Sequence, residues 1–154
     1  MRRNNGFTVV ELMIISAIVS ILVAVAAPSF TESMARRSLE GAANELNADL
    51  QYTKSQAVSI NTSVSMRTSE HGYIVSRALE DPNVPNLKTI TLDSKITLTS
   101  PLTISFEPYR DFANVADVTL THTQTLAQLQ LKIDAVGRIQ MCSPQGSFGT
   151  YIAC

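Results

Sequence analysis

The sequence predicts an α+β fold in which one long N-terminal helix packs on an antiparallel β-sheet. Changes of pattern along the 154 residues support this prediction. Residues 7–30 are almost entirely apolar, and residues 31–60 repeat apolar side chains at helical spacing. Beyond residue 61, apolar and polar side chains alternate, which is typical of strands with one buried face. With 45% hydrophobic and 16% charged residues the chain is globular, and the part after residue 30 suits one compact domain.

Residues 7–30 form the first expected element, an apolar helix. At about 1.5 Å per residue this length spans the hydrocarbon core of a bilayer, about 30 Å thick. One carboxylate, Glu11, lies one turn in from the start. A charge inside a membrane helix costs at least about 2.5 kcal/mol, so it normally marks a function and needs a partner. A secretory signal peptide has a shorter apolar stretch, and a plain membrane anchor leaves Glu11 unexplained.

Residues 31–60 are expected to form an amphipathic helix, with Thr31 or Ser33 capping its start. Its apolar side chains recur at spacings of three, four and seven, so they share one face, which should lie on a sheet. The residues of this face are Leu39, Ala43, Leu46, Leu50 and Ala57. The charged residues Glu40, Glu45, Asp49 and Lys54 are expected elsewhere on the helix.

Residues 62–142 are expected to form the antiparallel sheet. Alternating or short apolar runs occur at 64–66, 73–75, 90–92, 96–98, 102–106, 115–121, 129–133 and 136–142. The segment 80–86 has two prolines and two asparagines, so it is expected to be a surface loop.

The cysteines agree with an extracytoplasmic location for this sheet. Arg2 and Arg3 precede the apolar helix, so the positive-inside rule places the leader in the cytoplasm and the domain outside it. In an oxidising compartment Cys142 and Cys154 would form a disulfide that closes the C-terminal loop 142–154. Two free buried thiols are the alternative.

The start of the chain resembles the class III leader and first helix of type IV pilins and pseudopilins. The residues that carry this resemblance are Gly6, Phe7, Thr8, Glu11 and Pro28. It implies that prepilin peptidase removes the leader 1–6 by cleaving after Gly6 and methylates the new amino terminus of Phe7. It also implies that Glu11 guides docking into a filament and that Pro28 bends the helix. Residues 7–30 would then be a transmembrane and filament-core helix, and residues 31–154 a periplasmic domain with a pilin-like fold.

The body of the chain is similar to minor pilins and pseudopilins of the FimT, FimU and GspH kind. The similarity rests on residues 39–58, on Phe106-Glu107-Pro108 and on Gly137-Arg138. It implies a minor pilin that helps to initiate a type IV pilus, at or near its tip. The implied partners are other major and minor pilins, prepilin peptidase, the inner-membrane assembly platform and, before assembly, membrane lipid. The implied location is the inner membrane, as a single-pass protein, and then the pilus at the cell surface.

Two alternatives remain open, of which one is DNA binding in natural transformation. The FimT proteins bind DNA through a G-R-x-R motif, whose second arginine is replaced here by Gln140. Without Arg2, Arg3 and Glu11, the whole-chain totals of 12 basic and 13 acidic residues become 10 and 12, which gives no basic field for phosphates. A local patch of Lys132 and Arg138 is the candidate DNA contact.

The other alternative is a pseudopilin of type II secretion, because the leader and Glu11 do not separate the two systems. An enzyme is not expected. His71 and His122 are isolated and have no second ligand at metal spacing, so no metal site is predicted, and there is no G-x-S-x-G motif. No phosphate-binding G-x-x-x-x-G-K loop occurs either, so no cofactor is expected and a separate motor must drive assembly.

Overall fold

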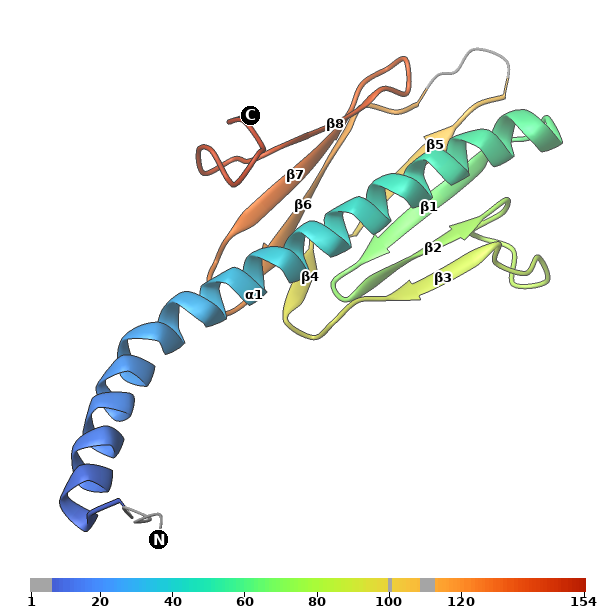
Figure 1. Ribbon diagram of the computed structural model, residues 1–154. Coiled ribbons are helices and arrows are strands. Elements are labelled where there is room, and N and C mark those ends of the chain that lie inside the picture. The colour runs from blue at the N-terminus through green and yellow to red at the C-terminus, as the bar shows by residue number, and fades with distance from the viewer. Residues whose placement is uncertain (1–6, 100, 109–112) are drawn as a thin grey trace, which may run out of the picture. The chain divides into compact units, whose positions relative to one another are not determined.

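The computed structural model describes residues 7–99, 101–108 and 113–154, with the backbone alone at residues 26–28 (Figure 1). Its elements are α1 (Val9–Ile60), β1 (Val64–Ser69), β2 (Gly72–Ser76), β3 (Lys88–Thr91), β4 (Ile96–Leu98), β5 (Leu102–Phe106), β6 (Ala116–His122), β7 (Gln128–Ile133) and β8 (Ile139–Cys142). The chain divides into two compact units, one ending at Ala35 and the other comprising Arg36–Cys154.

The helix is continuous between the two expected helical segments. α1 has 52 residues and does not begin anew at Thr31 or Ser33, so the caps expected there are wrong. The backbone of Pro28 lies within α1. A proline inside a helix removes one backbone hydrogen bond and favours a kink at that place.

The strands of the second unit form two antiparallel sheets of four strands each. Their orders are β3-β2-β1-β5 and β4-β6-β7-β8. The α+β class and the packing of a helix on antiparallel strands are confirmed, but the single sheet is replaced by two. Alternation fixes which side chains of a strand face the core, and it leaves the choice of neighbouring strands open.

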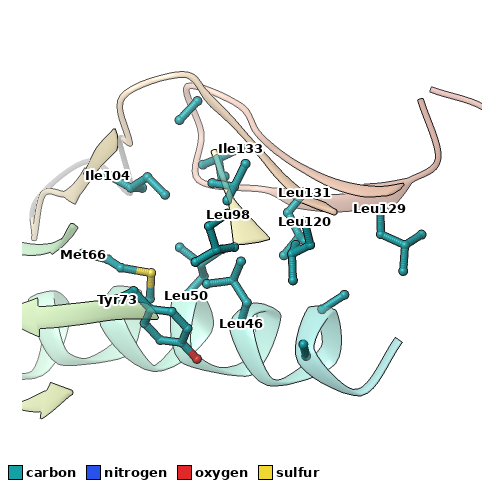
Figure 2. Close-up of a cluster of buried hydrophobic side chains, with 14 of the residues drawn as sticks. Leu46, Leu50, Met66, Tyr73, Leu98, Ile104, Leu120, Leu129, Leu131 and Ile133 are labelled. Atoms are coloured by element: carbon teal, nitrogen blue, oxygen red, sulfur yellow. The ribbon is translucent and has the colours of Figure 1, made fainter. Parts of the chain in front are cut away.

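The core of this unit lies between the second half of α1 and both sheets (Figure 2). The predicted apolar face of the helix is confirmed, because Leu39, Ala43, Leu46, Leu50 and Ala57 are all fully buried. Figure 2 shows Leu46 and Leu50 of α1 among side chains of both sheets. All buried residues of this core, and the partly buried ones packed on it, lie between Leu39 and Tyr151. The second unit therefore carries a complete core of its own.

Asp49 is the exception on the helix, since it was expected off the apolar face and is only 5% exposed. Its Oδ2 accepts a hydrogen bond of 2.8 Å from the Tyr73 hydroxyl, and its Oδ1 lies 2.5 Å from Nζ of Lys88. These two partners, from β2 and β3, satisfy the carboxylate and make its burial tolerable. Burial of the ring, and secondly the bond to Asp49, raise the pKa of Tyr73 far above its ordinary value.

The last expected strand, 136–142, is shorter than predicted and begins at Ile139. The Asp134 carboxylate accepts hydrogen bonds from the backbone N–H of Val136, at 3.1 Å, and of Arg138, at 2.8 Å. Gly137 has a φ of 66°, a value that glycine adopts without steric cost. These features make a tight turn between β7 and β8, so Val136 belongs to the turn and lies exposed.

Candidate functional site

The start of α1 is a capping box built by Thr8 and Glu11. The backbone N–H of Glu11 donates to Oγ1 of Thr8 at 3.2 Å, and the backbone N–H of Thr8 donates to Oε2 of Glu11 at 3.5 Å. Each side chain thus satisfies an amide that the helix itself leaves unpaired. The sequence signal for this pair is the pattern T-x-x-E at residues 8–11, which is typical of a capping box.

The Glu11 carboxylate is exposed and only weakly held in this position. Its contact with the Thr8 amide is at the outer limit of a hydrogen bond. The positive end of the helix dipole favours the negative charge at this place. The carboxylate can therefore exchange the Thr8 amide for a stronger cationic donor without leaving the helix terminus. Phe7, next to this pair, is 80% exposed, whereas Gly6 lies outside the described residues.

The first half of α1 presents an apolar surface on all sides. Its large apolar side chains from Val9 to Val25 are each at least 46% exposed. The helix is long and apolar enough in this part to cross a membrane. The Ser16 hydroxyl donates to the Met13 carbonyl at 2.9 Å, and the Ser20 hydroxyl donates to the Ser16 carbonyl at 2.7 Å. Because both hydroxyls bond inside the helix, they are compatible with an apolar environment.

The C-terminal loop is closed by the predicted disulfide between Cys142 and Cys154, which the structure confirms. The loop packs on the second half of α1. Phe148 is 8% exposed, and the guanidinium carbon of Arg36 lies 5.0 Å from the centroid of its ring, a cation–π contact. The disulfide ties the end of the loop to β8, and the ring contact holds the loop on the helix.

Lys132 and Arg138, the candidate DNA contacts, both line one shallow hollow of the second sheet, about 230 Å³ in volume. The same hollow is lined by Asp117 and Asp134. Lys132 is directly opposite Asp117 on β6, and Nε of Arg138 is 3.9 Å from Oδ2 of Asp134. Two cations beside two carboxylates give little attraction for phosphate groups.

The two histidines lie apart from any metal-ligand cluster. Within the described ranges, no group of three His, Cys, Asp or Glu side chains is placed to hold a metal ion. His122 is 2% exposed, and its Nδ1 lies 3.4 Å from the backbone nitrogen of Thr125 and 3.3 Å from its hydroxyl oxygen. The hydrogen bonds to Thr125 in the β6–β7 turn account for the burial of this histidine.

Comparisons with known proteins agree with this geometry. The profile of the family described as "Type II transport protein GspH" matches residues 42–137, and that of the "Prokaryotic N-terminal methylation motif" matches residues 1–27. No curated protein matches the sequence.

Two crystal structures of the type IV minor pilin FimU from Pseudomonas aeruginosa share the fold. One has a TM-score of 0.57 and 24% identity over 69% of this chain and 89% of that one. The other has a TM-score of 0.57 and 23% identity over 67% of this chain and 91% of that one.

Proposed function

The chain belongs to the GspH family of pilin-like proteins, and from this premise we propose that it is a minor pilin that helps to initiate assembly of a type IV pilus, at or near its tip. The observation that carries the proposal is the contrast along α1. From Leu39 onward one apolar face of the helix is buried on its own sheets, while the large apolar side chains before residue 26 are exposed and Glu11 lies at their start. Such a helix requires burial by groups outside the chain.

Prepilin peptidase would supply the partner of Glu11. Cleavage between Gly6 and Phe7 breaks that peptide bond and leaves an α-amino group on Phe7, which the enzyme then methylates. The amino group remains cationic and lies near the membrane surface. The Glu11 carboxylate of one subunit then pairs with the amino terminus of a neighbouring subunit, because two opposite charges removed from water are tolerated when both are satisfied.

Assembly then moves the apolar helix from lipid into a filament core of similar helices. Before assembly the subunit lies in the inner membrane with residues 31–154 in the periplasm. The assembly platform and a separate motor extract it, and the major and minor pilins replace its lipid contacts. Pro28 lacks the amide hydrogen of a helical residue, so α1 can bend there to orient the domain on the filament.

A pseudopilin of a type II secretion system is a second candidate, favoured by the description of the matching family. The two candidates differ in the neighbours of the subunit. Affinity purification of the tagged full chain after cross-linking in cells, followed by mass spectrometry, distinguishes them. Pilus minor pilins among the neighbours support the first candidate, and secretion pseudopilins support the second.

Glu11→Val tests the assembly mechanism. We expect this variant to reach the membrane fraction at the wild-type level, because the change makes the helix more apolar. Its amount in sheared filaments should fall at least about tenfold. The amino terminus of the neighbouring subunit would be buried without its carboxylate, which costs about 3 kcal/mol or more.

Thr8→Val is the matched control, because it removes the Thr8 oxygen from the capping box and leaves the Glu11 carboxylate in place. We expect it to enter filaments. Normal incorporation of Glu11→Val would refute the docking role, and an equal loss with Thr8→Val would assign the effect to helix capping.

A further inference from the structure

The outer edge of β8 has backbone groups that point away from β7, its neighbour in the second sheet. The backbone N–H of Asp134 donates to the Arg138 carbonyl at 3.1 Å, so Arg138 directs its hydrogen bonds toward β7. Antiparallel pairs alternate between bonded and non-bonded types along a strand. Gln140 and Cys142 therefore also bond β7, while the N–H and C=O groups of Ile139 and Met141 point outward.

The edge of β5 in the first sheet and the edge of β4 in the second sheet are each capped by polar groups of the chain itself. On β5, the Asn114 side chain accepts a hydrogen bond from the Ser105 N–H at 2.6 Å and donates to the Thr103 carbonyl at 2.8 Å, as a neighbouring strand would. On β4, the Leu98 N–H donates to the Glu70 carbonyl at 3.0 Å. These edges are closed to strand addition.

The chain itself covers the far end of the β8 edge. The Ser143 N–H donates to the Ile152 carbonyl at 2.9 Å, and the Cys154 N–H donates to the Ser143 carbonyl at 3.0 Å, so residues 152–154 run beside it as a parallel bridge. The Cys142–Cys154 disulfide holds this short segment in place. Across residues 7–99, 101–108 and 113–154, no such bond continues along the edge to Ile139 or Met141.

A hollow lies beside the uncovered part of this edge. It has a volume of about 490 Å³ and is lined by Lys132, Gln140, Met141, Cys142 and residues 152–154. The Ile152 side chain at its end is 75% exposed. The site thus combines outward main-chain groups with an apolar neighbour, which together suit an extended peptide that brings an apolar side chain.

We infer that the edge of β8 at Ile139–Met141 accepts an extended strand of a neighbouring subunit and joins it to the second sheet. The inference rests on the proposed filament function, which supplies the neighbouring subunit. The incoming strand bonds the N–H and C=O groups of Ile139 and Met141 and places an apolar side chain on Ile152.

Backbone amide exchange on the full chain, resolved to single residues, tests this inference directly. The chain in detergent micelles is compared with the chain in sheared filaments. The Ile139 and Met141 amides should exchange at least about tenfold more slowly in filaments, because each gains a hydrogen bond. The Gln140 and Cys142 amides already bond β7 and serve as an internal control that is protected in both states. Unchanged fast exchange of Ile139 and Met141 in filaments would overturn the inference.

Met141→Pro provides a second, independent test. Proline removes the outward N–H without removing a bond to β7, which is the way edge strands tolerate proline. We expect at least about tenfold less of this variant in filaments, the loss expected from about 1.4 kcal/mol.

Two variants control this test. Met141→Ala shortens the same side chain and keeps the amide. Thr89→Pro makes the same change on β3. The Leu92 N–H donates to the His71 carbonyl at 2.9 Å, so by alternation along the strand Ile90 bonds β2 and the Thr89 amide points outward. Both controls should incorporate normally.

The outcomes separate this inference from the proposed function. Protection of the Gln140 amide from exchange in micelles shows that β8 of Met141→Pro still pairs with β7. If that variant then enters filaments as well as Met141→Ala does, strand addition is refuted and the filament role stands. If the wild-type chain enters no filament, the proposed function is refuted, and strand addition in a filament with it.

Discussion

Lys88→Met isolates the energetic role of the buried ion pair that joins α1 to the first sheet. The Asp49 side chain is 7% exposed and that of Lys88 is 36% exposed. Methionine keeps much of the length of the lysine stem and removes its charge. The variant leaves the Asp49 carboxylate buried beside the Tyr73 hydroxyl, a neutral donor that compensates only part of the charge.

The expected loss follows from the burial of the two partners. Removing one partner of a fully buried pair costs about 3–5 kcal/mol. Since Lys88 is more than a third exposed, water screens its end of the pair, and we expect a loss of about 1–3 kcal/mol in the free energy of unfolding. Arg67→Met is the matched control, because Arg67 pairs with Glu80 at side-chain exposures of 38% and 87%. Its loss should lie between about 0 and 1 kcal/mol.

Urea unfolding of the soluble fragment 31–154 measures both losses, because this fragment contains the whole buried core. The double variant Asp49→Asn, Lys88→Met should recover most of the loss, since an amide at position 49 still accepts the hydrogen bond from Tyr73 and needs no cation. A loss for Lys88→Met no larger than that for Arg67→Met would refute the reasoning. So would a double variant that is less stable than Lys88→Met alone.

Three further predictions concern the same fragment. Because burial and Asp49 raise the pKa of Tyr73, the folded state keeps a proton that the unfolded chain loses above its ordinary pKa of 10.0. The contribution to stability is complete below that pH and declines above it, so wild type should lose up to about 1.4 kcal/mol per pH unit more than Tyr73→Phe in urea melts. Reduction of Cys142–Cys154 should cost about 3 kcal/mol in urea melts, and equal stability with and without reductant would contradict this. In gel shifts at low salt we expect no DNA binding; binding that weakens with salt and in Lys132→Gln and Arg138→Gln would instead support a DNA-binding role.

Periodicity predicted the elements of the fold because each period is a local property of the chain. The stripe that contains Leu46 and Leu50 predicted the buried face of α1, and both side chains are fully buried. The alternation at Val64 and Met66 predicted β1, whose side chains alternate between buried and partly exposed. The assembly residues at the start of the chain could be proposed from their motif alone, because leader, glutamate and apolar helix are contiguous in the sequence.

Features that join distant segments could not be predicted in this way. Asp49 lies next to a buried face, and only the arrival of Tyr73, 24 residues later, and Lys88, 39 residues later, stabilises it there. The division into two sheets likewise depends on which strand edges are capped, and the Asn114 side chain that caps β5 lies outside any strand. Hydrogen bonds of this kind leave no periodic signal.

The free energies of burying the side chains of α1 indicate which step Glu11 controls in the proposed mechanism. Burying one Val, Leu or Ile side chain contributes about 1.5–3 kcal/mol, so the exposed apolar residues from Phe7 to Val25 together outweigh the cost of one carboxylate several-fold. Glu11 therefore does not determine whether the helix leaves water. The choice between lipid and filament is different, because lipid tails are as apolar as leucine side chains and the two apolar contributions nearly cancel. In lipid Glu11 has no cation beside it, and an unpaired charge costs about 2.5–3.5 kcal/mol at mid-bilayer. Relief of about 3 kcal/mol of this cost by pairing in the filament is enough to favour the filament about a hundredfold.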